Sequence, residues 1–294
     1  MRAVTTSAFG VRAPIIRPGD NLVKITADCV LEAAKQNGLK LKDRDIVAVT
    51  EAVVAKSQGN FASVEDISRE VSKKMGKGKV GLIFPILSRN RFSQILKGIV
   101  EGVDELVIQL SYPFDEVGNP LVSIDKLYDL GLHNFNQDFT SQQFYKLVGS
   151  VEHPFTGIDY IEAYSKICGD KAQIILSNDP CEILKHTNKV ICADIHSRKR
   201  NKKLLLASGA KKVICLDEIL NKKSAKHGYH EQFGVLGSNM SSDGTIKLFP
   251  RNCQKFVDAL QAELKKRTGL NFECMVYGDG AFKDPVGGIW ELAD

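Results

Sequence analysis

The sequence predicts a mixed α/β fold, and three observations carry that prediction. Short apolar runs rich in β-branched residues, such as Ile46 to Val49, have the length and composition of buried strands. Capped segments with helical spacing of apolar residues separate these runs. From Tyr160 to Leu220, strands and helices alternate, which is the pattern of a parallel α/β layer. At 294 residues, the chain has room for one large domain or two ordinary ones.

Residues 1–150 are expected to form the first part of the main domain. Helices are predicted where a capping side chain precedes residues at helical spacing, namely after Asp20, after Ser63 with Asp66 as its partner, and after Ser88. Strands are predicted in the apolar runs 46–49 and 106–110. The turn-rich stretch 114–136 indicates an excursion that carries loops.

Residues 151–220 are expected to form a small three-stranded parallel α/β subdomain inserted into that domain. Its predicted strands are the runs 172–178, 189–195 and 211–219, and a helix is predicted in 180–187. Two strand ends carry polar tips, Ser177-Asn178-Asp179 and Asp194-Ile195-His196. Ligands bind at the carboxyl ends of strands in such sheets. Taken alone, however, each tip favours an ordinary turn between a strand and a helix.

Residues 221–294 are expected to complete the main domain. Glycines surround a Ser238-Asn239 pair, and a strand is predicted in 245–249. An amphipathic helix that ends on Gly269 comes next. A final strand, 272–277, leads to Asp279, which has a glycine on either side. A strand that ends on such a carboxylate is typical of a ligand or metal site.

Composition and charge exclude several classes of protein. Hydrophobic residues make up 43% of the chain, but no apolar run approaches the roughly 20 residues of a membrane span. The N-terminus has no signal-peptide core, and seven singly spread cysteines indicate reduced thiols, so a cytoplasmic protein is expected. The basic runs 73–79, 197–203 and 265–267 lack interleaved aromatic residues, which favours solvated surfaces over a nucleic-acid groove. The net charge of +5 suits a small substrate that bears phosphate.

Several residues could carry chemistry. The "GVLGSN" segment at 234–239 lacks the Gly-Lys-Ser/Thr ending of a Walker loop, yet its amides with Ser238 and Asn239 could cradle a phosphate. Lys56 follows a strand and could either neutralise a phosphate or be exposed. The candidate ligands for Mg²⁺ are Asp279, Asp284 and Asp243. A lone loop carboxylate is otherwise a turn former, and the flanking glycines favour Asp279 among the three.

A zinc site is not predicted. Cys192 and His196 lie four residues apart and His227 and His230 three apart, but the two pairs occupy different kinds of segment. The sequence contains no Cys-x-x-Cys motif. Every cysteine lies in an apolar run, which favours a buried, inert thiol over a nucleophile.

Four blocks of sequence, residues 10–22, 45–60, 237–250 and 269–287, carry a resemblance to a known family. In this order they resemble the γ-glutamyl ligases that add glutamate to the deazaflavin redox coenzyme. The resemblance is closer to a bacterial branch in organisms that do not make the coenzyme, some members of which are proposed to glutamylate folate. It implies a γ-glutamyl ligase-like mixed-sheet fold, with residues 160–220 as the insertion of the longer branch.

The resemblance also implies a reaction. ATP or GTP would phosphorylate a substrate carboxylate, and the amine of L-glutamate would attack the acyl phosphate to form an amide. Mg²⁺ or Mn²⁺ would bridge the phosphates. The acceptor would be a small carboxylate, folate or a related pterin, and the ligase would be a homodimer with no membrane or nucleic-acid partner.

Site residues follow from the same resemblance. Lys56 and Gly59 match the family's Ser-Lys-x-x-Gly motif, which implies nucleotide binding and, for Lys56, a catalytic role. Gly237, Ser238 and Asn239 match the segment that contains its Ser-Asn pair, which implies nucleotide binding. Asp279 matches an aspartate that ligates metal in the family.

This sequence departs from the family pattern at three places. Val235-Leu236 stand where the family has an aspartate, so Asp243 is the candidate replacement ligand. Gly278 and Gly280 replace two threonines. Family members continue well past the aspartate block, whereas this chain ends at Asp294, so a truncated C-terminus is expected. Two other hypotheses stay open: a non-catalytic nucleotide-binding protein and an RNA-binding protein that uses the basic runs.

Overall fold

The computed structural model describes residues 7–153, 156–278, 280–283 and 290–293. Within them, residues 7–60 and 250–278 form a first compact unit, and residues 61–153 and 156–249 form a second. Strands β12 (Gly280–Lys283) and β13 (Trp290–Ala293) pair with each other in a small sheet. The structure confirms the mixed α/β class that the sequence predicts.

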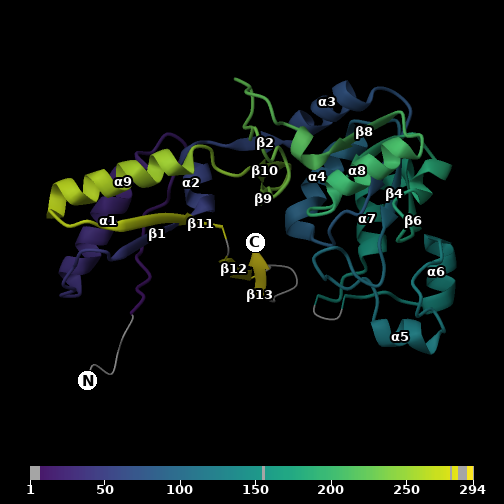
Figure 1. Ribbon diagram of the computed structural model, residues 1–294, viewed down its shortest axis with the longest axis horizontal. Helices are drawn as coiled ribbons and strands as arrows, with labels where there is room; N and C mark the ends of the chain where they lie inside the picture. The colour runs from purple at the N-terminus through teal and green to yellow at the C-terminus, as the bar shows by residue number, and fades with distance from the viewer. Residues whose placement is uncertain (1–6, 154–155, 279, 284–289, 294) are drawn as a thin grey trace. The chain divides into compact units, whose positions relative to one another are not determined.

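The first unit packs two long helices against a two-stranded parallel sheet. Strand β1 (Ile46–Thr50) pairs with β11 (Glu273–Tyr277), and the register places Thr50 opposite Tyr277. Helix α1 (Leu22–Gln36) lies along α9 (Cys253–Thr268), and the short α2 (Glu51–Ser57) follows β1 directly (Figure 1). The core joins apolar side chains from all of these elements, among them Leu22, Val47, Val54, Leu260 and Phe272.

A six-stranded sheet forms the centre of the second unit. Its strands lie in the order β5 (Phe139–Thr140), β6 (Ala172–Leu176), β4 (Glu105–Leu110), β3 (Lys79–Ile83), β7 (Lys189–Cys192) and β8 (Lys212–Cys215). All neighbours are parallel except β5, which runs antiparallel to β6. The chain first builds outward from β3 through β4 to β6, and then returns to the other side of β3 with β7 and β8.

Helices cover both faces of this sheet. Successive residues of a strand face opposite sides, so Leu82 joins one apolar cluster and Ile83 the other. The larger cluster holds residues of α3 (Val64–Met75), α4 (Arg89–Glu101), α5 (Ile124–Asp129), α6 (Ser141–Val148) and α7 (Tyr160–Cys168). The smaller cluster holds Leu205 of α8 (Arg198–Ala207). Short 3₁₀ turns lie at Gly169–Lys171, Glu182–Lys185 and Leu216–Glu218.

A second, antiparallel sheet completes this unit. Its strands lie in the order β2 (Phe61–Ser63), β10 (Thr245–Lys247) and β9 (Asn239–Ser242). The β9–β10 hairpin lies against α4. The sheet therefore pairs β2 with a hairpin that lies more than 170 positions further along the chain.

The structure groups the strands differently from the expected division at residues 150 and 220. Strands β6, β7 and β8 share one sheet with β3 and β4, so residues 151–220 do not form a separate three-stranded layer. The physical reason is that β3 is buried on both faces. Its backbone groups on both edges therefore need hydrogen-bonded neighbours, and β4 and β7 supply them. The segment 180–187 forms a short 3₁₀ turn rather than the predicted helix.

Local capping signals explain most helix starts. Ser63 and Asp66 form the predicted capping box of α3, and Ser88 caps α4 by accepting the Arg91 amide. Helix α1 is capped by Asn21 and not by Asp20. Asp20 instead accepts the Arg17 amide at 2.7 Å, which tightens the turn before the helix.

Close packing of α3 on α4 depends on two glycines, Gly98 within α4 and Gly102, which caps the C-terminus of α4. A Cβ added at Gly102 would lie 2.6 Å from the Ser68 carbonyl oxygen, and one added at Gly98 would lie 2.6 Å from Ile67. We expect Gly102→Ala to destabilise the protein by about 1–3 kcal/mol, because backbone cannot yield as a flexible side chain can. Urea denaturation measures this, with Gly10→Ala as the control because nothing lies within 4 Å of a Cβ there. Equal midpoints for the two variants would contradict this packing.

Candidate functional site

In the first unit, the ends of β1 and β11 meet at the start of α2. Gly278, the residue after β11, lies so that an added Cβ would be 3.9 Å from the Glu51 Cγ atom. Lys56 is exposed in the last turn of α2. Asp279 and Asp284, predicted metal ligands, lie outside the described residues. The strand that leads to Asp279 therefore ends beside the helix that carries Lys56.

The loop after Lys56 is fixed by polar contacts. Gly59 has a φ of 62°, which favours glycine. The side-chain amide of Gln58 donates to the Arg251 backbone carbonyl at 2.6 Å, and its oxygen accepts from the Arg251 backbone N–H at 2.8 Å. The Arg251 guanidinium donates to Asn60, which is fully buried. These contacts hold the Lys-Ser-Gln-Gly-Asn segment in one conformation.

The same loop also contacts the turn before α1. The Gly19 amide donates to the Ser57 carbonyl at 2.8 Å, and a Cβ at Gly59 would lie 3.3 Å from the Pro18 side chain. Two of the sequence blocks that carry the family resemblance are therefore in direct contact. Sequence reasoning missed Arg251 and Asn60, although an arginine directly after Pro250 in the third block was an available signal.

In the second unit, the glycine turn before β9 leaves no room for a side chain. Gly237 has a φ of 74°, and a Cβ there would lie 2.4 Å from the Phe249 ring. Ser238 is 1% exposed, and its hydroxyl donates to the Val235 carbonyl at 2.8 Å. Asn239 begins β9 and stands opposite Lys247 of β10. The turn thus places a half-buried amide side chain beside a buried lysine.

Two polar residues of α4 hold the β9–β10 hairpin. The Asn90 Nδ2 atom lies 3.4 Å from the Asn239 Oδ1 atom. One turn later, the Gln94 side chain accepts the Gly244 amide at 2.9 Å. Asn90, Gln94 and Lys247 were not predicted. The available signal was the polar pair spaced four apart on a helix face that is otherwise apolar.

Asp243 has a clear structural role. It precedes Gly244, whose φ is 76°, in the turn between β9 and β10, and the register shifts just after the turn. Its carboxylate is exposed, and its Oδ1 atom lies 3.5 Å from the Gln94 Nε2 atom. The residue therefore forms a turn and still presents oxygen atoms that a cation could reach.

The predicted site residues fall into two groups. Gly237, Ser238, Asn239 and Asp243 come together in the second unit around the start of β9 and its hairpin. Lys56 and Gly59 belong to the first unit. Each group is an ordered element of its own unit.

The polar strand tips of the parallel sheet act mainly as structural clamps. The Glu116 carboxylate accepts three successive amides, those of Ile195, His196 and Ser197, at 2.6–2.8 Å. Burial alone would raise the pKa of Glu116, but these hydrogen bonds lower it overall. Asn178 bonds the Tyr112 backbone in both directions. Ordinary turns, favoured at both tips by the sequence, account for these contacts.

A cluster of possible metal ligands at the end of β8 is already engaged by cations. Among the described residues, Cys215, Asp217 and Glu218 lie close enough together to share an ion. Arg198 donates to Asp217 at 2.9 Å, and Lys202 donates to Glu218 at 2.6 Å. These ion pairs neutralise both carboxylates, so the cluster does not indicate a metal centre.

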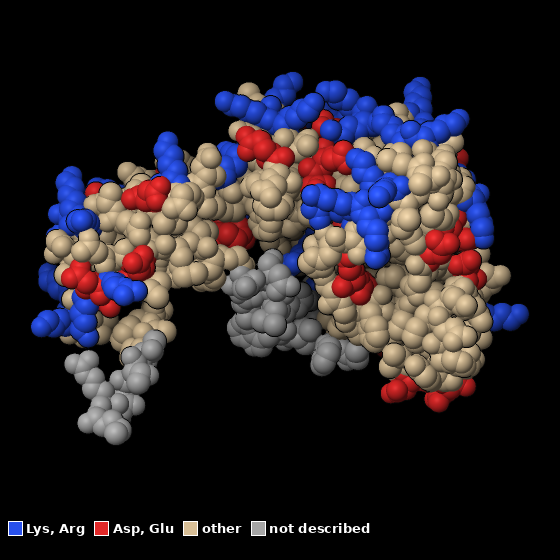
Figure 2. Space-filling model, in the orientation of Figure 1, with Lys and Arg blue, Asp and Glu red and all other residues tan. Residues whose placement is uncertain are grey.

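Lysine and arginine side chains gather over α3 and α8 in the second unit (Figure 2). Within the run 197–203, Arg198 and Lys202 form ion pairs while Lys199 and Arg200 are exposed. That these basic runs form a solvated surface rather than a nucleic-acid groove stays a prediction. None of the helices in the described part of the chain has the length and hydropathy that a membrane span requires.

Comparison with known families identifies the class of protein. A family model matches residues 10–294, nearly the whole chain, and it places the protein among the ligases that form γ-glutamyl bonds. The family is that of the F420-0:Gamma-glutamyl ligases, and the chain belongs to it. A search of curated proteins found no match. The sequence resemblance to this family is thereby confirmed, while the folate branch stays a prediction.

The buried carboxyl group of Asp194, at the second strand tip, should make the stability of the protein depend on pH. It is 1% exposed, its Oδ2 atom accepts from Asn201, and its Oδ1 atom has no partner within the described residues. Burial raises the pKa of this carboxyl to about 7, and the negative charge of Glu116 adds to the rise. The folded state therefore holds a proton that the unfolded state releases near its usual pKa of 3.8.

The contribution of Asp194 to stability is consequently complete below the unfolded pKa and is lost as pH rises through about 7. We expect stability to fall by up to about 1.4 kcal/mol per pH unit between pH 5 and 7 from this group. Asp194→Asn removes that component, which urea midpoints of both proteins across this range will show. Parallel pH profiles would contradict the assignment.

Proposed function

We propose that the protein is a ligase that uses a nucleoside triphosphate and a divalent metal ion to form a γ-glutamyl amide bond. One observation carries this proposal: the match to the γ-glutamyl ligase family over residues 10–294. The ordered Lys56–Asn60 loop and Gly237–Asn239 turn support it, because each holds one accessible polar side chain, Lys56 or Asn239, on a backbone fixed by close contacts.

The chemistry explains why such a site needs cations and amides. An amine does not displace oxygen from a free carboxylate, so the carboxylate first takes the terminal phosphoryl group and the nucleoside diphosphate leaves. The glutamate nitrogen then attacks the acyl phosphate carbon, the carbon–oxygen bond to phosphate breaks, and inorganic phosphate is released with the amine proton. Negative charge builds on phosphate oxygens at both steps, so fixed positive groups accelerate them.

Lys56 supplies such a charge, and we assign it to the transferred phosphoryl group. Gly59 supplies the left-handed backbone that lets the loop close after it. Gly237, Ser238 and Asn239 are assigned to the phosphates of ATP or GTP. The half-buried amide side chain of Asn239 suits phosphate oxygens, while Gly237 and the buried Ser238 fix the turn that holds it. Lys247, opposite Asn239, adds a positive charge beside that turn within the second unit.

The metal would be Mg²⁺ or Mn²⁺, which take oxygen ligands. Asp243 fits this role, because its carboxylate is exposed and its contact with Gln94 is long, at 3.5 Å. Asp279 is the other assigned ligand. When bound, the metal would neutralise the triphosphate and polarise its terminal phosphorus. The proposal extends to folate or a related pterin as acceptor, to L-glutamate as the incoming amine, and to a homodimer.

One observation favours a second candidate, a nucleotide-binding protein without turnover. At the position where the family resemblance implies an aspartate, Val235 is fully buried and Leu236 is 7% exposed, both within the large apolar core of the second unit. This position cannot ligate a metal ion. A protein of this kind would gain thermal stability with nucleotide and metal but would release no phosphate.

The direct test combines ATP or GTP, Mg²⁺ or Mn²⁺, L-glutamate and folate with the full-length protein. We expect phosphate release together with an acceptor that gains the mass of one glutamate residue. Chelation with excess EDTA should abolish both signals, and added Mn²⁺ should restore them. Thermal stabilisation by nucleotide without phosphate release would favour the second candidate and overturn the ligase.

A variant of Lys56 tests its assigned role. We expect Lys56→Met to lower kcat/KM for the nucleotide by about a hundredfold, because one charge is removed from the developing phosphate oxygens. Lys35→Met is the matched control, since Lys35 is also an exposed lysine in the last turn of a helix of the first unit. Steady-state phosphate release measures both variants. A Lys56 variant as active as the control would remove this residue from the site.

A further inference from the structure

A cavity of about 300 Å³ lies within the second unit, between α4 and α7. Met240 of β9 closes one side of it. Cavities of this volume are at the lower end of the range that binds small ligands in proteins. The cavity contains none of the site residues predicted from the sequence, so it is a separate feature that needs its own explanation.

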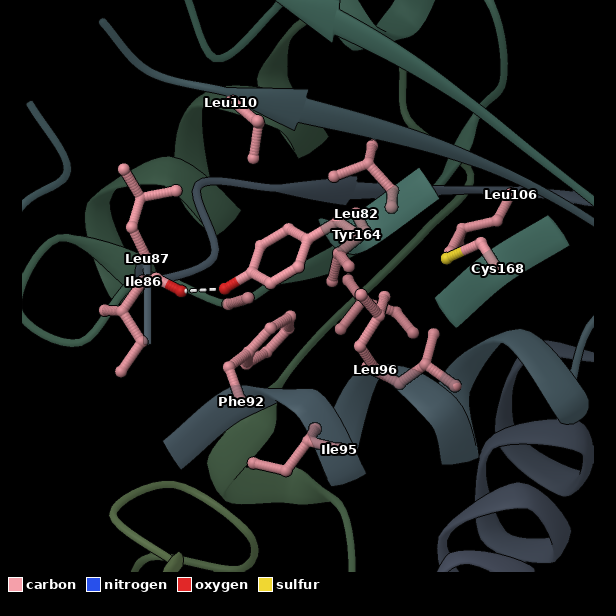
Figure 3. Close-up of a cluster of buried hydrophobic side chains, with 14 of the residues drawn as sticks. Leu82, Ile86, Leu87, Phe92, Ile95, Leu96, Leu106, Leu110, Tyr164 and Cys168 are labelled. Atoms are coloured by element: carbon pink, nitrogen blue, oxygen red, sulfur yellow. Dashed lines mark hydrogen bonds between the residues drawn. The ribbon is translucent and has the colours of Figure 1, made fainter. Parts of the chain in front are cut away.

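The walls of the cavity are aromatic and aliphatic. Tyr160 and Tyr164 contribute rings whose centroids lie 5.7 Å apart at 71°, and Ile167 and Met240 contribute apolar surface. The Tyr164 hydroxyl is turned away to the Ile86 carbonyl, and its ring is held among Leu82, Phe92 and Leu96 (Figure 3). Rigid rings together with a thioether favour a flat aromatic occupant over a flexible chain.

Polar groups line the cavity on the α4 side. Gln94 accepts the Gly244 amide through its oxygen, but its nitrogen makes only long contacts of 3.5 Å, with Asp243 and Met240. That nitrogen keeps donor capacity for an acceptor on the edge of a ring. Arg89, in the first turn of α4, adds positive charge to the lining. The Ser93 hydroxyl donates its proton to the Arg89 backbone carbonyl at 2.5 Å and is therefore not a donor for a ligand.

The cavity adjoins the turn that is assigned to nucleotide phosphates. Met240 follows Asn239 directly on β9, and Gln94 lies one helical turn from Asn90, which contacts Asn239. Both the cavity wall and the Ser238–Asn239 turn are thus held by the same contact between α4 and β9. A ring in the cavity would lie next to whatever the turn binds.

We propose that this cavity binds a flat heteroaromatic ring that carries an anionic group. The ring packs against the apolar surface of Ile167 and Met240, beside the buried tyrosine pair, an edge atom accepts from Gln94, and the anion meets Arg89. Identifying the ring with a substrate of the ligase rests on the proposed function. Two sources share this chemistry, namely the base of the nucleotide and the ring of an acceptor such as folate, and the experiment below separates them.

Filling the cavity tests the proposal. Ala163 of α7 lines it and is only half-buried, so Ala163→Leu extends into the cavity without removing any packing. Ser165→Leu is the matched control, because it adds the same side chain to an exposed position of the same helix outside the lining. Calorimetric titration with GTP, ATP, folate and inorganic triphosphate, in the presence of Mg²⁺ and without glutamate, gives the dissociation constants.

We expect at least one ring-bearing probe to bind the wild-type protein and the control, and to bind Ala163→Leu at least about tenfold more weakly. Inorganic triphosphate should not distinguish the proteins, since it has no ring. A loss confined to GTP or ATP assigns the cavity to the nucleotide base, and a loss confined to folate assigns it to the acceptor. Equal affinities of every probe for both variants would overturn the proposal, as would the absence of binding by any ring-bearing probe.

A second measurement uses the wild-type protein alone. Met240 lines the cavity and is half-buried, so hydrogen peroxide should oxidise its thioether to the sulfoxide at a rate that mass spectrometry can follow. Saturation with the probe that binds should slow this oxidation severalfold, and an unchanged rate would contradict occupancy. Because neither experiment needs turnover, a protein that binds the ring but forms no amide would refute the ligase and keep this inference.

Discussion

The contact between α4 and the β9–β10 hairpin is the interaction on which the site of the second unit depends. Helix α4 packs closely on α3 because Gly98 and Gly102 leave no side chain between them. Its N-terminal half then offers the side chains of Asn90 and Gln94 to the hairpin, and these two side-chain amides fix Asn239 and the Gly244 turn. The tight contact between α3 and α4 therefore sets the position of a short polar turn that lies more than 130 residues further along the sequence.

Much of this fold could be predicted from local sequence signals. The capping box of Ser63 and Asp66, the helix stop at Gly269 and the apolar strands are encoded by neighbouring residues, so pattern and spacing suffice. The family resemblance of four separated blocks was likewise visible, because each block keeps its own glycines and polar residues. The contacts between Pro18 and Gly59 and between Gly19 and Ser57 show that two of those blocks pack together.

Long-range pairing is what the sequence did not disclose. Nothing in the run 172–178 says that its neighbour is β4, and three strands placed in an expected subdomain instead extend the sheet of β3 on both sides. The same limit applies to the site. Arg251 reaches Asn60 only because two loops that are distant in the sequence are brought together. The side chain of Gln94 holds the β9–β10 hairpin, and the spacing of residues in the sequence does not reveal that contact.

The central claim is that the chain activates a carboxylate as an acyl phosphate before an amide forms. Transfer of oxygen tests this most directly. An acceptor whose carboxylate carries ¹⁸O should pass one labelled oxygen to inorganic phosphate for every amide made, because the bond that breaks lies between carbon and that oxygen. Mass spectrometry of the released phosphate measures the transfer. Label that stays wholly in the acceptor and its product, with unlabelled phosphate, would contradict the account.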